Sequence, residues 1–482
     1  MFKYRPICFI ISLLLIALSA AMLLPALADG LAGNPDWLVF LVSAGVTLAI
    51  GGMLALQSIG GDIELNLREA FLLTTAAWVA LSAFAALPFV FSTLGIDYTD
   101  AFFEAISGLT TTGSTVLVGL DTMPPGLLLW RALLQWMGGI GIIVMAVAIL
   151  PFLRVGGMQL FQTESSDRSD KILPRPGQIA SAILSVYIAL TVACAVLYAA
   201  FGMTGFDALA HAMTTLATGG YSTKDGSISY FNSPGIEWVG TVFMIAGALP
   251  FVLYVRAIQG RVWMFWGDSQ VRVFLTSLLI IVGLLTLWLW SVGLYDPATA
   301  LRLAAFNVVS IVTTTGYASA DYGAWGGFAV MMILIVTFLG GCSGSTSGAI
   351  KIFRFQVLAV ILRWQLNRLF SPNGVFPRRY NGRPLADDAQ LSVVAFFALF
   401  VTTFGVVAIL LGAVGLDFIS AVSGAATALA NVGPGLGSEI GPSGNFANLP
   451  DIGKWILSAA MLLGRLELFT VYVLFLPQFW RG

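Results

Sequence analysis

The sequence predicts an all-α integral membrane protein with ten transmembrane helices. Two N-terminal helices would be followed in the sequence by four pseudo-symmetric repeats that surround one pore. Each repeat would consist of a helix, a re-entrant pore loop and a second helix. Of the 482 residues, 58% are hydrophobic and only 10% are charged, which is more apolar surface than a soluble domain can bury. Ten apolar segments are long enough to cross a bilayer. A threonine- and glycine-rich segment also recurs four times, about 100 residues apart.

Each of the ten expected spans supplies the roughly 20 apolar residues that a helix needs to cross the hydrocarbon core. They lie near residues 8–27, 37–58, 71–94, 127–150, 179–203, 236–255, 273–295, 328–360, 391–415 and 455–478. The first resembles a signal peptide, but no small-residue cleavage site followed by a soluble domain is evident, so we expect a retained helix. The eighth is too long for one helix and is broken in its middle.

The basic residues predict that both termini are cytoplasmic. With that orientation, 18 of the 23 Lys and Arg residues fall on the inner side, 4 fall on the outer side, and Arg465 lies within a span. Membrane proteins concentrate positive charge on the cytoplasmic side. The four threonine–glycine segments then all lie on the outer side. A net charge of −1 gives no electrostatic support for nucleic-acid binding, so we expect no nucleic-acid partner.

From residue 71 onward, each repeat consists of a span, a short amphipathic segment, a glycine loop and a second span. The short segments lie near residues 99–112, 205–218, 299–315 and 418–431. They are too short to cross a bilayer and suit re-entrant half-helices, whose C-terminal ends carry partial negative charge that favours a cation. We expect two N-terminal transmembrane helices in residues 1–70, followed by pore repeats 1 to 4 in residues 71–178, 179–270, 271–390 and 391–482.

The outer segments also contain acidic residues, among them Asp97, Asp225, Asp296 and Asp417. An acidic vestibule would concentrate cations before they enter a pore. Helix caps and solvated loop residues would explain the same positions without a role in transport. Both interpretations remain open from the sequence.

The glycine loops contain the residues that we expect to bind a dehydrated monovalent cation. A ring of backbone carbonyls can replace the hydration shell of such an ion, and the close approach of four strands requires glycine. Oxygen ligands without carboxylates favour a monovalent ion over Ca²⁺ or Mg²⁺. The candidate ligands are Thr111, Thr112, Gly113, Thr218, Gly219, Gly220, Thr314, Thr315, Gly316, Asn431, Val432 and Gly433. Helix C-caps followed by turns are the structural alternative.

The eighth span contains a run of small residues that cannot form a stable lipid-facing helix. Its residues are Gly340, Gly341, Cys342, Ser343, Gly344, Ser345, Thr346, Ser347 and Gly348. Irregular backbone at membrane depth is tolerated where it lines a cavity. A glycine-rich packing seam between helices is the alternative. Arg465, inside the last expected span, would be a costly charge that indicates function, and a structural ion pair is its alternative.

These motifs resemble those of the Trk/Ktr/HKT superfamily of cation transporters, and over nearly the whole chain they are most similar to the TrkH type of membrane subunit in bacterial Trk potassium uptake systems. The resemblance implies a K⁺ selectivity filter in which the four key glycines are Gly113, Gly220, Gly316 and Gly433. Na⁺-preferring plant relatives have serine at the first of these, so glycine here implies K⁺. Ser114 and Pro434 stand where copies two and three have tyrosine, which departs from the potassium-channel signature and implies looser selectivity.

The same resemblance implies a gate, partners and a location. The 340–348 segment would be an intramembrane gating loop, and Arg465 would project toward the pore, repel cations and hydrogen-bond the loop. The family forms homodimers and pairs with a cytosolic, nucleotide-binding regulatory subunit of the TrkA type, for which segments 151–178 and 351–390 are long enough to dock. K⁺, and Rb⁺ with it, would be the transported ion, without an organic cofactor. The chain would contact membrane lipid in the bacterial cell inner membrane.

Two other classes of function remain as alternatives. A secondary transporter for another solute, coupled to Na⁺ or H⁺, would also contain broken helices, but such folds usually have two related halves. An intramembrane protease of the rhomboid type is indicated by Gly341-Cys342-Ser343-Gly344, a weak motif whose partner would have to be the single histidine, His211. We therefore expect a transporter and not an enzyme. The sequence does not decide between passive and coupled flux.

Overall fold

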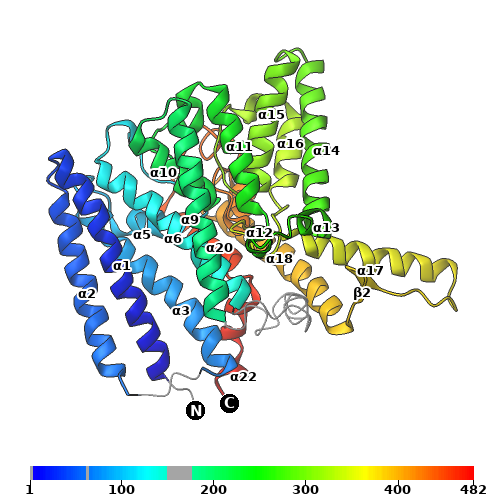
Figure 1. Ribbon diagram of the computed structural model, residues 1–482, viewed down its shortest axis with the longest axis horizontal. Helices are drawn as coiled ribbons and strands as arrows, with labels where there is room; N and C mark the ends of the chain where they lie inside the picture. The colour runs from blue at the N-terminus through cyan, green and yellow to red at the C-terminus, as the bar shows by residue number, and fades with distance from the viewer. Residues whose placement is uncertain (1–3, 61–64, 149–175, 482) are drawn as a thin grey trace.

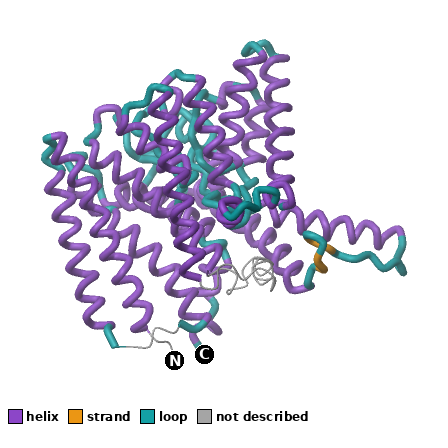
Figure 2. The backbone as a smooth tube through the Cα atoms, viewed as in Figure 1, coloured by secondary structure: helices purple, strands orange, loops and turns teal. Residues whose placement is uncertain are grey.

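The computed structural model describes residues 4–60, 65–148 and 176–481, and these residues form an almost entirely helical bundle (Figure 2). Seven helices within these residues are long and apolar enough to cross a membrane, or nine if each of two bent helix pairs is one span. The expected all-α membrane architecture is thereby confirmed. The two termini lie at the same end of the bundle (Figure 1). The expected docking segment 151–178 lies outside the described residues except for its last three.

The outer helices surround the bundle. α1 (Tyr4–Ala32) and α2 (Trp37–Ser58) form an antiparallel pair at one edge (Figure 1). The first helices of the four repeats are α3 (Leu67–Ala85) with α4 (Leu87–Phe91), α9 (Pro176–Ala200), α14 (Ser269–Ser291) and α18 (Asp387–Ala413). Each of the repeats thus begins with a long apolar helix, as the hydrophobic pattern predicts.

Four short helices follow these outer helices at the expected re-entrant positions. They are α5 (Tyr98–Leu109), α10 (Gly205–Leu216), α15 (Pro297–Val312) and α19 (Phe418–Ala430). Each begins at a side chain that accepts a backbone N–H of the first turn: Asp97, Thr204, Asp296 and Asp417. Such caps satisfy donors that the helix itself leaves unpaired. For Asp97, Asp296 and Asp417 the structure therefore supports the capping interpretation over a vestibule of free carboxylates.

Three of the four inner segments are broken. Only α6 (Pro125–Ala148) is a single helix. α11 (Pro234–Ala248) and α12 (Phe251–Ile258) meet at 94°, and α20 (Asp451–Arg465) meets α21 (Phe469–Tyr472) and η5 (Val473–Phe475) at 107°. The spans expected at 236–255 and 455–478 are therefore bent pairs of helices and not single straight helices. Pro250 explains the first break, because proline lacks an N–H and cannot continue a helix.

The third inner segment is interrupted as the sequence predicts. α16 (Gly327–Val336) and α17 (Ile352–Phe370) flank an irregular stretch at 337–351. α17 projects from the bundle, and the chain then turns back so that a hairpin of β1 (Arg379–Tyr380) and β2 (Arg383–Pro384) lies beside α17 (Figure 1). The remaining short helices are α13 (Met264–Gly267), α22 (Pro477–Trp480), η1 (Leu120–Thr122), η3 (Ser227–Phe231) and η4 (Tyr322–Ala324).

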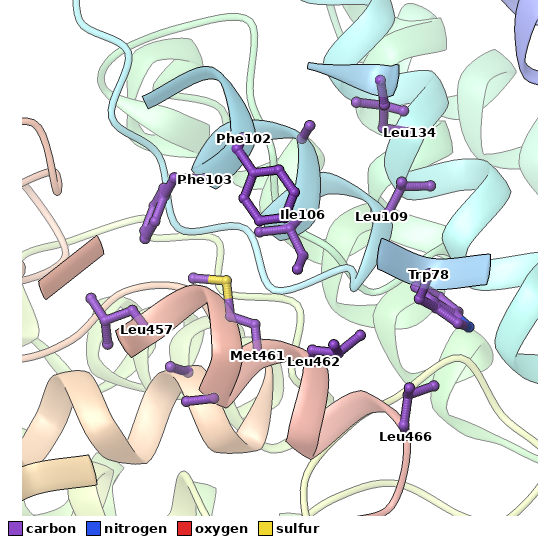
Figure 3. Packing of buried hydrophobic residues seen from close by; sticks show 14 of the residues in the cluster. Trp78, Phe102, Phe103, Ile106, Leu109, Leu134, Leu457, Met461, Leu462 and Leu466 are labelled. Atoms are coloured by element: carbon purple, nitrogen blue, oxygen red, sulfur yellow. The ribbon is translucent and has the colours of Figure 1, made fainter. Parts of the chain in front are cut away.

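Packing of the re-entrant helices joins successive repeats. α5 packs against α6 of its own repeat and against α20 of the fourth, where Phe102, Ile106 and Leu109 lie near Leu134 and Met461 (Figure 3). Likewise α10 packs against α11 and α6, and α15 packs against α16 and α11. Each of these three helices thus contacts the inner helix of its own repeat and that of the preceding one. This arrangement brings the four glycine loops together at the centre.

Candidate functional site: a glycine ring and the loop beneath it

The four re-entrant helices end with the same backbone geometry. Each has one residue in the left-handed region, with φ of 53°, 51°, 61° and 55° at Thr111, Thr218, Thr314 and Asn431. The next residue in each copy donates its N–H to the carbonyl five residues earlier, at distances between 2.8 and 3.0 Å. This is a helix C-cap of the Schellman kind. The alternative of C-caps followed by turns is therefore correct for the local geometry, although it does not account for the glycine that follows.

The four glycines, which we call the glycine ring, close a circle of contacts. Gly113, Gly220, Gly316 and Gly433 have φ of 87°, 76°, 80° and 109°. We call the segment around each ring glycine a strand. A Cβ on each of the four glycines would come too close to a carbonyl oxygen of the neighbouring strand, and those oxygens belong to Gly219, Thr315, Val432 and Thr112 in that order. Repeat 1 thus meets repeat 2, 2 meets 3, 3 meets 4, and 4 meets 1. Both the backbone angle and the close approach require glycine.

All four ring glycines line one open depression with an empty volume of about 540 Å³. Three charged residues also line it: Arg131, Lys224 and Asp225. Asp225 accepts the backbone N–H groups of Gly119 and Leu120, so it orders a loop as well as facing the depression. The lining of this depression therefore has two cations and one carboxylate. It is not the acidic vestibule that we considered as one interpretation of the acidic outer segments.

Tyrosines from the second and third strands support the ring. The Tyr221 hydroxyl donates to the Glu104 carbonyl on α5 at 2.8 Å, and the Tyr317 hydroxyl donates to the His211 carbonyl on α10 at 3.1 Å. Each tyrosine thus fastens its strand to the re-entrant helix of the preceding repeat. Ser114 stands where these strands have tyrosine, and its hydroxyl donates to the carbonyl of Gly433 at 2.8 Å. Ser114 therefore links the first strand to the fourth.

His211 is a packed residue in this scaffold. Its ring nitrogens lie 2.8 Å from the Asp207 carbonyl oxygen and 2.9 Å from the Ser222 hydroxyl, and the ring is fully buried. The backbone N–H of Ser343, the proposed protease nucleophile, donates to the side chain of Gln270. Both His211 ring nitrogens are engaged by residues of its own repeat, and neither contacts Ser343. The geometry gives the protease alternative no support.

Glu104, Arg131 and Gln135 are buried polar residues that sequence reasoning did not select for the site. Glu104 and Arg131 form a buried ion pair at 2.7 Å, and Arg131 also donates to the Ser222 carbonyl at 2.7 Å. Gln135 contacts the second strand, one turn further along α6. The available signal was a polar or charged side chain within an apolar segment, which at membrane depth indicates function or a buried partner.

Removing the Glu104 carboxylate is expected to destabilise the protein. Glu104→Ala leaves the buried Arg131 guanidinium without its counter-charge, which costs about 3–5 kcal/mol in proteins. Thermal unfolding in detergent, followed by tryptophan fluorescence, measures the loss. Asp387→Ala is the matched control, because the Arg378–Asp387 pair is solvent-exposed and is worth about 1 kcal/mol or less. Equal losses in the two variants would contradict a buried, stability-determining pair.

The 340–348 segment lies directly beneath the glycine ring and bonds to the C-terminal ends of two re-entrant helices, and the residue after it bonds to the end of a third. The Thr346 hydroxyl donates to the Leu216 carbonyl at 3.1 Å, and the Ser347 hydroxyl donates to the Thr313 carbonyl at 2.8 Å. Just beyond the segment, the Ala349 N–H donates to the Ala430 carbonyl at 2.8 Å. These bonds satisfy helix-end carbonyls that have no partner within their own helices. The segment thus connects its own repeat with repeats 2 and 4.

Arg465 lies at the C-terminal end of α20, where the helix breaks, and not well inside a continuous span as expected. Its guanidinium donates to the Thr346 carbonyl at 2.9 Å and to the Gly138 carbonyl at 3.3 Å. Glu467, the nearby acid, instead forms a buried ion pair with Arg354 at 2.5 Å. Arg465 therefore holds the 340–348 segment against the first repeat.

Positive charge predominates beneath the glycine ring. The Lys351 ammonium donates to the Ser347 carbonyl, and Arg354 and Arg465 are buried nearby. Within the described part of the loop region and its neighbours, Glu467 is the one acidic side chain that pairs with this group. Three cationic groups therefore lie near one carboxylate at this level.

A larger cavity lies away from the ring, between α1, α3 and α6. Its empty volume is about 1190 Å³, and apolar side chains such as Leu14, Trp78 and Met145 line most of it. None of the four ring glycines lines it. Among the described residues, no group of three or more His, Cys, Asp and Glu side chains is arranged to hold a metal ion. The glycine ring is therefore the arrangement that offers converging oxygen ligands.

Comparison with known proteins supports one family. Residues 39–481 match the TrkH family model, described as a cation transport protein. The chain is 50% identical to the Trk system potassium uptake protein TrkI of Halomonas elongata, over 99% of this chain and 97% of that protein. It is 41% identical to TrkH of Salmonella typhimurium, over 99% of both chains. The crystal structure of the potassium transporter TrkH from Vibrio parahaemolyticus superposes with a TM-score of 0.92 at 37% identity, covering 100% of both chains.

Proposed function

This chain belongs to the TrkH family of cation transport proteins, and on that premise we propose that it takes up K⁺ across the bacterial inner membrane through a gated pore lined with carbonyl groups. It is a multi-pass membrane transport protein and not an enzyme. The observation that carries the proposal is the closed circle of contacts among Gly113, Gly220, Gly316 and Gly433.

In the proposed filter, carbonyl oxygens of the four strands replace the hydration shell of the ion. The strands comprise residues 111–113, 218–220, 314–316 and 431–433. Four helices end at these strands with their partial negative charge directed toward them, which favours a cation. Carbonyl ligands without carboxylates suit K⁺ and Rb⁺, which give up their hydration shells more readily than divalent ions do. Ser114 and Pro434 stand where the other two strands have tyrosine. The proposed filter is therefore less uniform than that of a tetrameric channel, whose four strands are identical.

In the proposed gate, residues 340–348 block the pore below the filter and Arg465 keeps them there. Support comes from the hydrogen bond from Arg465 to the Thr346 carbonyl, and from the bonds between the loop and the re-entrant helix ends. Opening requires these bonds to break and the cationic groups to leave the ion path. A cytosolic, nucleotide-binding subunit of the TrkA type would shift this equilibrium, with segment 351–390 as one docking region.

The remaining expectations complete the proposal. Both termini would be cytoplasmic, the chain would form a homodimer, and the domain boundaries would fall at residues 70, 178, 270 and 390. The two termini lie at one end of the molecule, in agreement with a shared side (Figure 1). The relatives are named as proteins of a "Trk system", which indicates that they work with further components.

Flux through the purified chain in liposomes tests the proposed function. We expect K⁺ and Rb⁺ to leave loaded vesicles faster than Na⁺, because the ring offers carbonyl ligands and no carboxylates. The assay needs Arg465→Ala alongside the wild type, so that a closed gate is not mistaken for the absence of a pore. Absence of K⁺-preferring flux in both proteins, also with the regulatory subunit present, would favour a secondary transporter for another solute.

A further inference from the structure

We propose that Gln135 is a positioning residue that sets K⁺ preference by holding the second strand of the glycine ring, an inference that rests on the proposed function. Gln135 is fully buried on α6. Its side-chain Nε2 donates to the Gly219 carbonyl at 2.6 Å, and its Oε1 accepts the Tyr221 N–H at 3.0 Å. The reverse orientation of the amide would place donor against donor and acceptor against acceptor, so both contacts fix its direction. The residue between them is the ring glycine Gly220.

Gln135 occupies the space of a side chain that the second strand lacks. In the other three strands, the residue before the ring glycine carries a side chain: Thr112, Thr315 and Val432. The corresponding residue of the second strand is Gly219. A Cβ on Gly219 would overlap the Gln135 amide, and the three atoms nearest to it all belong to Gln135. Gly219 does not have a left-handed φ. Gln135, and not the backbone, therefore requires glycine at this position.

The inner helices of the other repeats confirm that Gln135 is an exception. Three glycines can be matched because a Cβ on each would crowd the carbonyl of the leucine two positions before the left-handed residue of its repeat: Gly138 with Leu109, Gly247 with Leu216, and Gly464 with Leu429. The residues three positions before these glycines are Gln135, Met244 and Met461. By this relation, the first repeat has glutamine where the second and fourth have methionine.

In these three repeats, the inner-helix residue can be compared with the residue before the ring glycine of the next repeat around the ring. The first repeat differs from the second and fourth in both residues. Pseudo-symmetry relates Gln135 and Gly219 to Met244 and Thr315, and to Met461 and Thr112. The carbonyl of Met461 accepts from the Asn431 amide, which also donates to the Thr112 hydroxyl at 2.9 Å, so the last pair lies in one hydrogen-bonded group. A long polar residue thus accompanies glycine, whereas methionine accompanies threonine. The first combination replaces side-chain packing with two hydrogen bonds to the strand itself.

The carbonyl that Gln135 holds is also the one that closes the ring against the first strand. A Cβ on Gly113 would overlap the Gly219 carbonyl oxygen. Arg131, one turn earlier on α6, donates to the Ser222 carbonyl at 2.7 Å and covers the Tyr221 ring at 4.1 Å. α6 therefore fixes the second strand at Gly219, Tyr221 and Ser222. A shift of Gly219 changes the spacing between the first two strands, on which the fit of a dehydrated ion depends.

Exchange of the two residues tests this role in the liposome flux assay. Gln135→Met keeps the length of the side chain and removes both hydrogen bonds, so we expect the K⁺-to-Na⁺ flux ratio to fall about tenfold. Gly219→Thr adds a side chain that overlaps Gln135. We expect it to lower K⁺ flux more strongly than Gln135→Met does. The double variant Gln135→Met/Gly219→Thr recreates the methionine–threonine pair of the other repeats. It is expected to recover K⁺ flux and selectivity relative to Gly219→Thr alone.

Met461→Leu is the matched control, since it is a volume-conserving change at the equivalent position and should keep the wild-type ratio. An unchanged ratio in Gln135→Met, or a double variant no better than Gly219→Thr, would overturn the inference. If Gln135→Met does not reach the membrane, the comparison of the double variant with Gly219→Thr still decides. A wild-type protein without K⁺-preferring flux contradicts the proposed function instead, so the two failures are distinguishable.

Discussion

Gly316→Ser is expected to lower the K⁺-to-Na⁺ flux ratio by about 100-fold, or to abolish K⁺ flux altogether. Gly316 has φ of 80°, and a Cβ there would overlap the Val432 carbonyl oxygen and lie 2.8 Å from Pro434 Cδ. A left-handed backbone strain of about 1–3 kcal/mol adds to an overpacking cost of similar size. Because each factor of ten in a ratio corresponds to about 1.4 kcal/mol, the combined cost accounts for the expected loss.

Gly327→Ala is the control for this variant. Gly327 lies in the same repeat at the start of α16, and a Cβ there would meet no atom within 4 Å. Isotope flux from liposomes loaded with K⁺ or Na⁺ measures both variants, with the folded fraction checked by size-exclusion chromatography. A folded Gly316→Ser protein with wild-type selectivity would exclude the glycine ring as the filter.

Arg465→Ala is expected to raise the basal K⁺ flux about tenfold or more in the absence of a regulatory subunit. The change removes the hydrogen bonds to the carbonyls of Thr346 and Gly138, and it removes one buried positive charge. Hydrogen bonds from charged groups contribute about 1.5–3 kcal/mol each, so a closed state that depends on Arg465 becomes much less populated. K⁺ efflux from liposomes measures the basal rate directly.

Two further substitutions separate the charge of Arg465 from its hydrogen bonds. Arg465→Lys keeps the charge but lacks the planar fork that reaches two carbonyls, whereas Arg465→Gln keeps a donor without the charge. If repulsion of the cation closes the pore, the lysine variant stays closed and the glutamine variant leaks. If the bond to Thr346 closes it, the glutamine variant leaks less than alanine does. A basal flux equal to the wild type in all three variants would remove Arg465 from the gate.

The repeated organisation of this protein could be predicted because it depends on local patterns. Apolar length gave the outer helices, and the recurrence of threonine or asparagine before glycine located the four re-entrant helix ends to within a few residues. The density of glycine and serine at 340–348 predicted the interruption between α16 and α17. Each of these features depends on residues that are close together in the sequence, so it could be predicted without knowledge of distant contacts.

The contacts between repeats could not be predicted in the same way. The break after α11 has a local signal in Pro250, whereas the break after α20 is stabilised by the pairing of Glu467 with Arg354 from α17. The role of Gln135 depends on an absent side chain at Gly219, more than 80 residues away along the chain. A polar residue in an apolar segment is a signal that Gln135 has a buried partner, but only the tertiary fold shows that the partner is the second strand.

The bonds from Ser347 and Gly348 to Thr313 and Thr314 have a thermodynamic consequence for the direction of control. Thr313 ends the re-entrant helix and Thr314 begins the strand that ends at Gly316, so the loop and the strand share a hydrogen-bonding group at Thr314. Equilibrium linkage between two sites is reciprocal: if release of the loop changes the affinity of the strand for an ion, then binding of that ion changes the stability of the closed loop by the same factor. If the proposed filter and gate are correct, K⁺ on the filter side would be an effector of the gate as well as the transported ion.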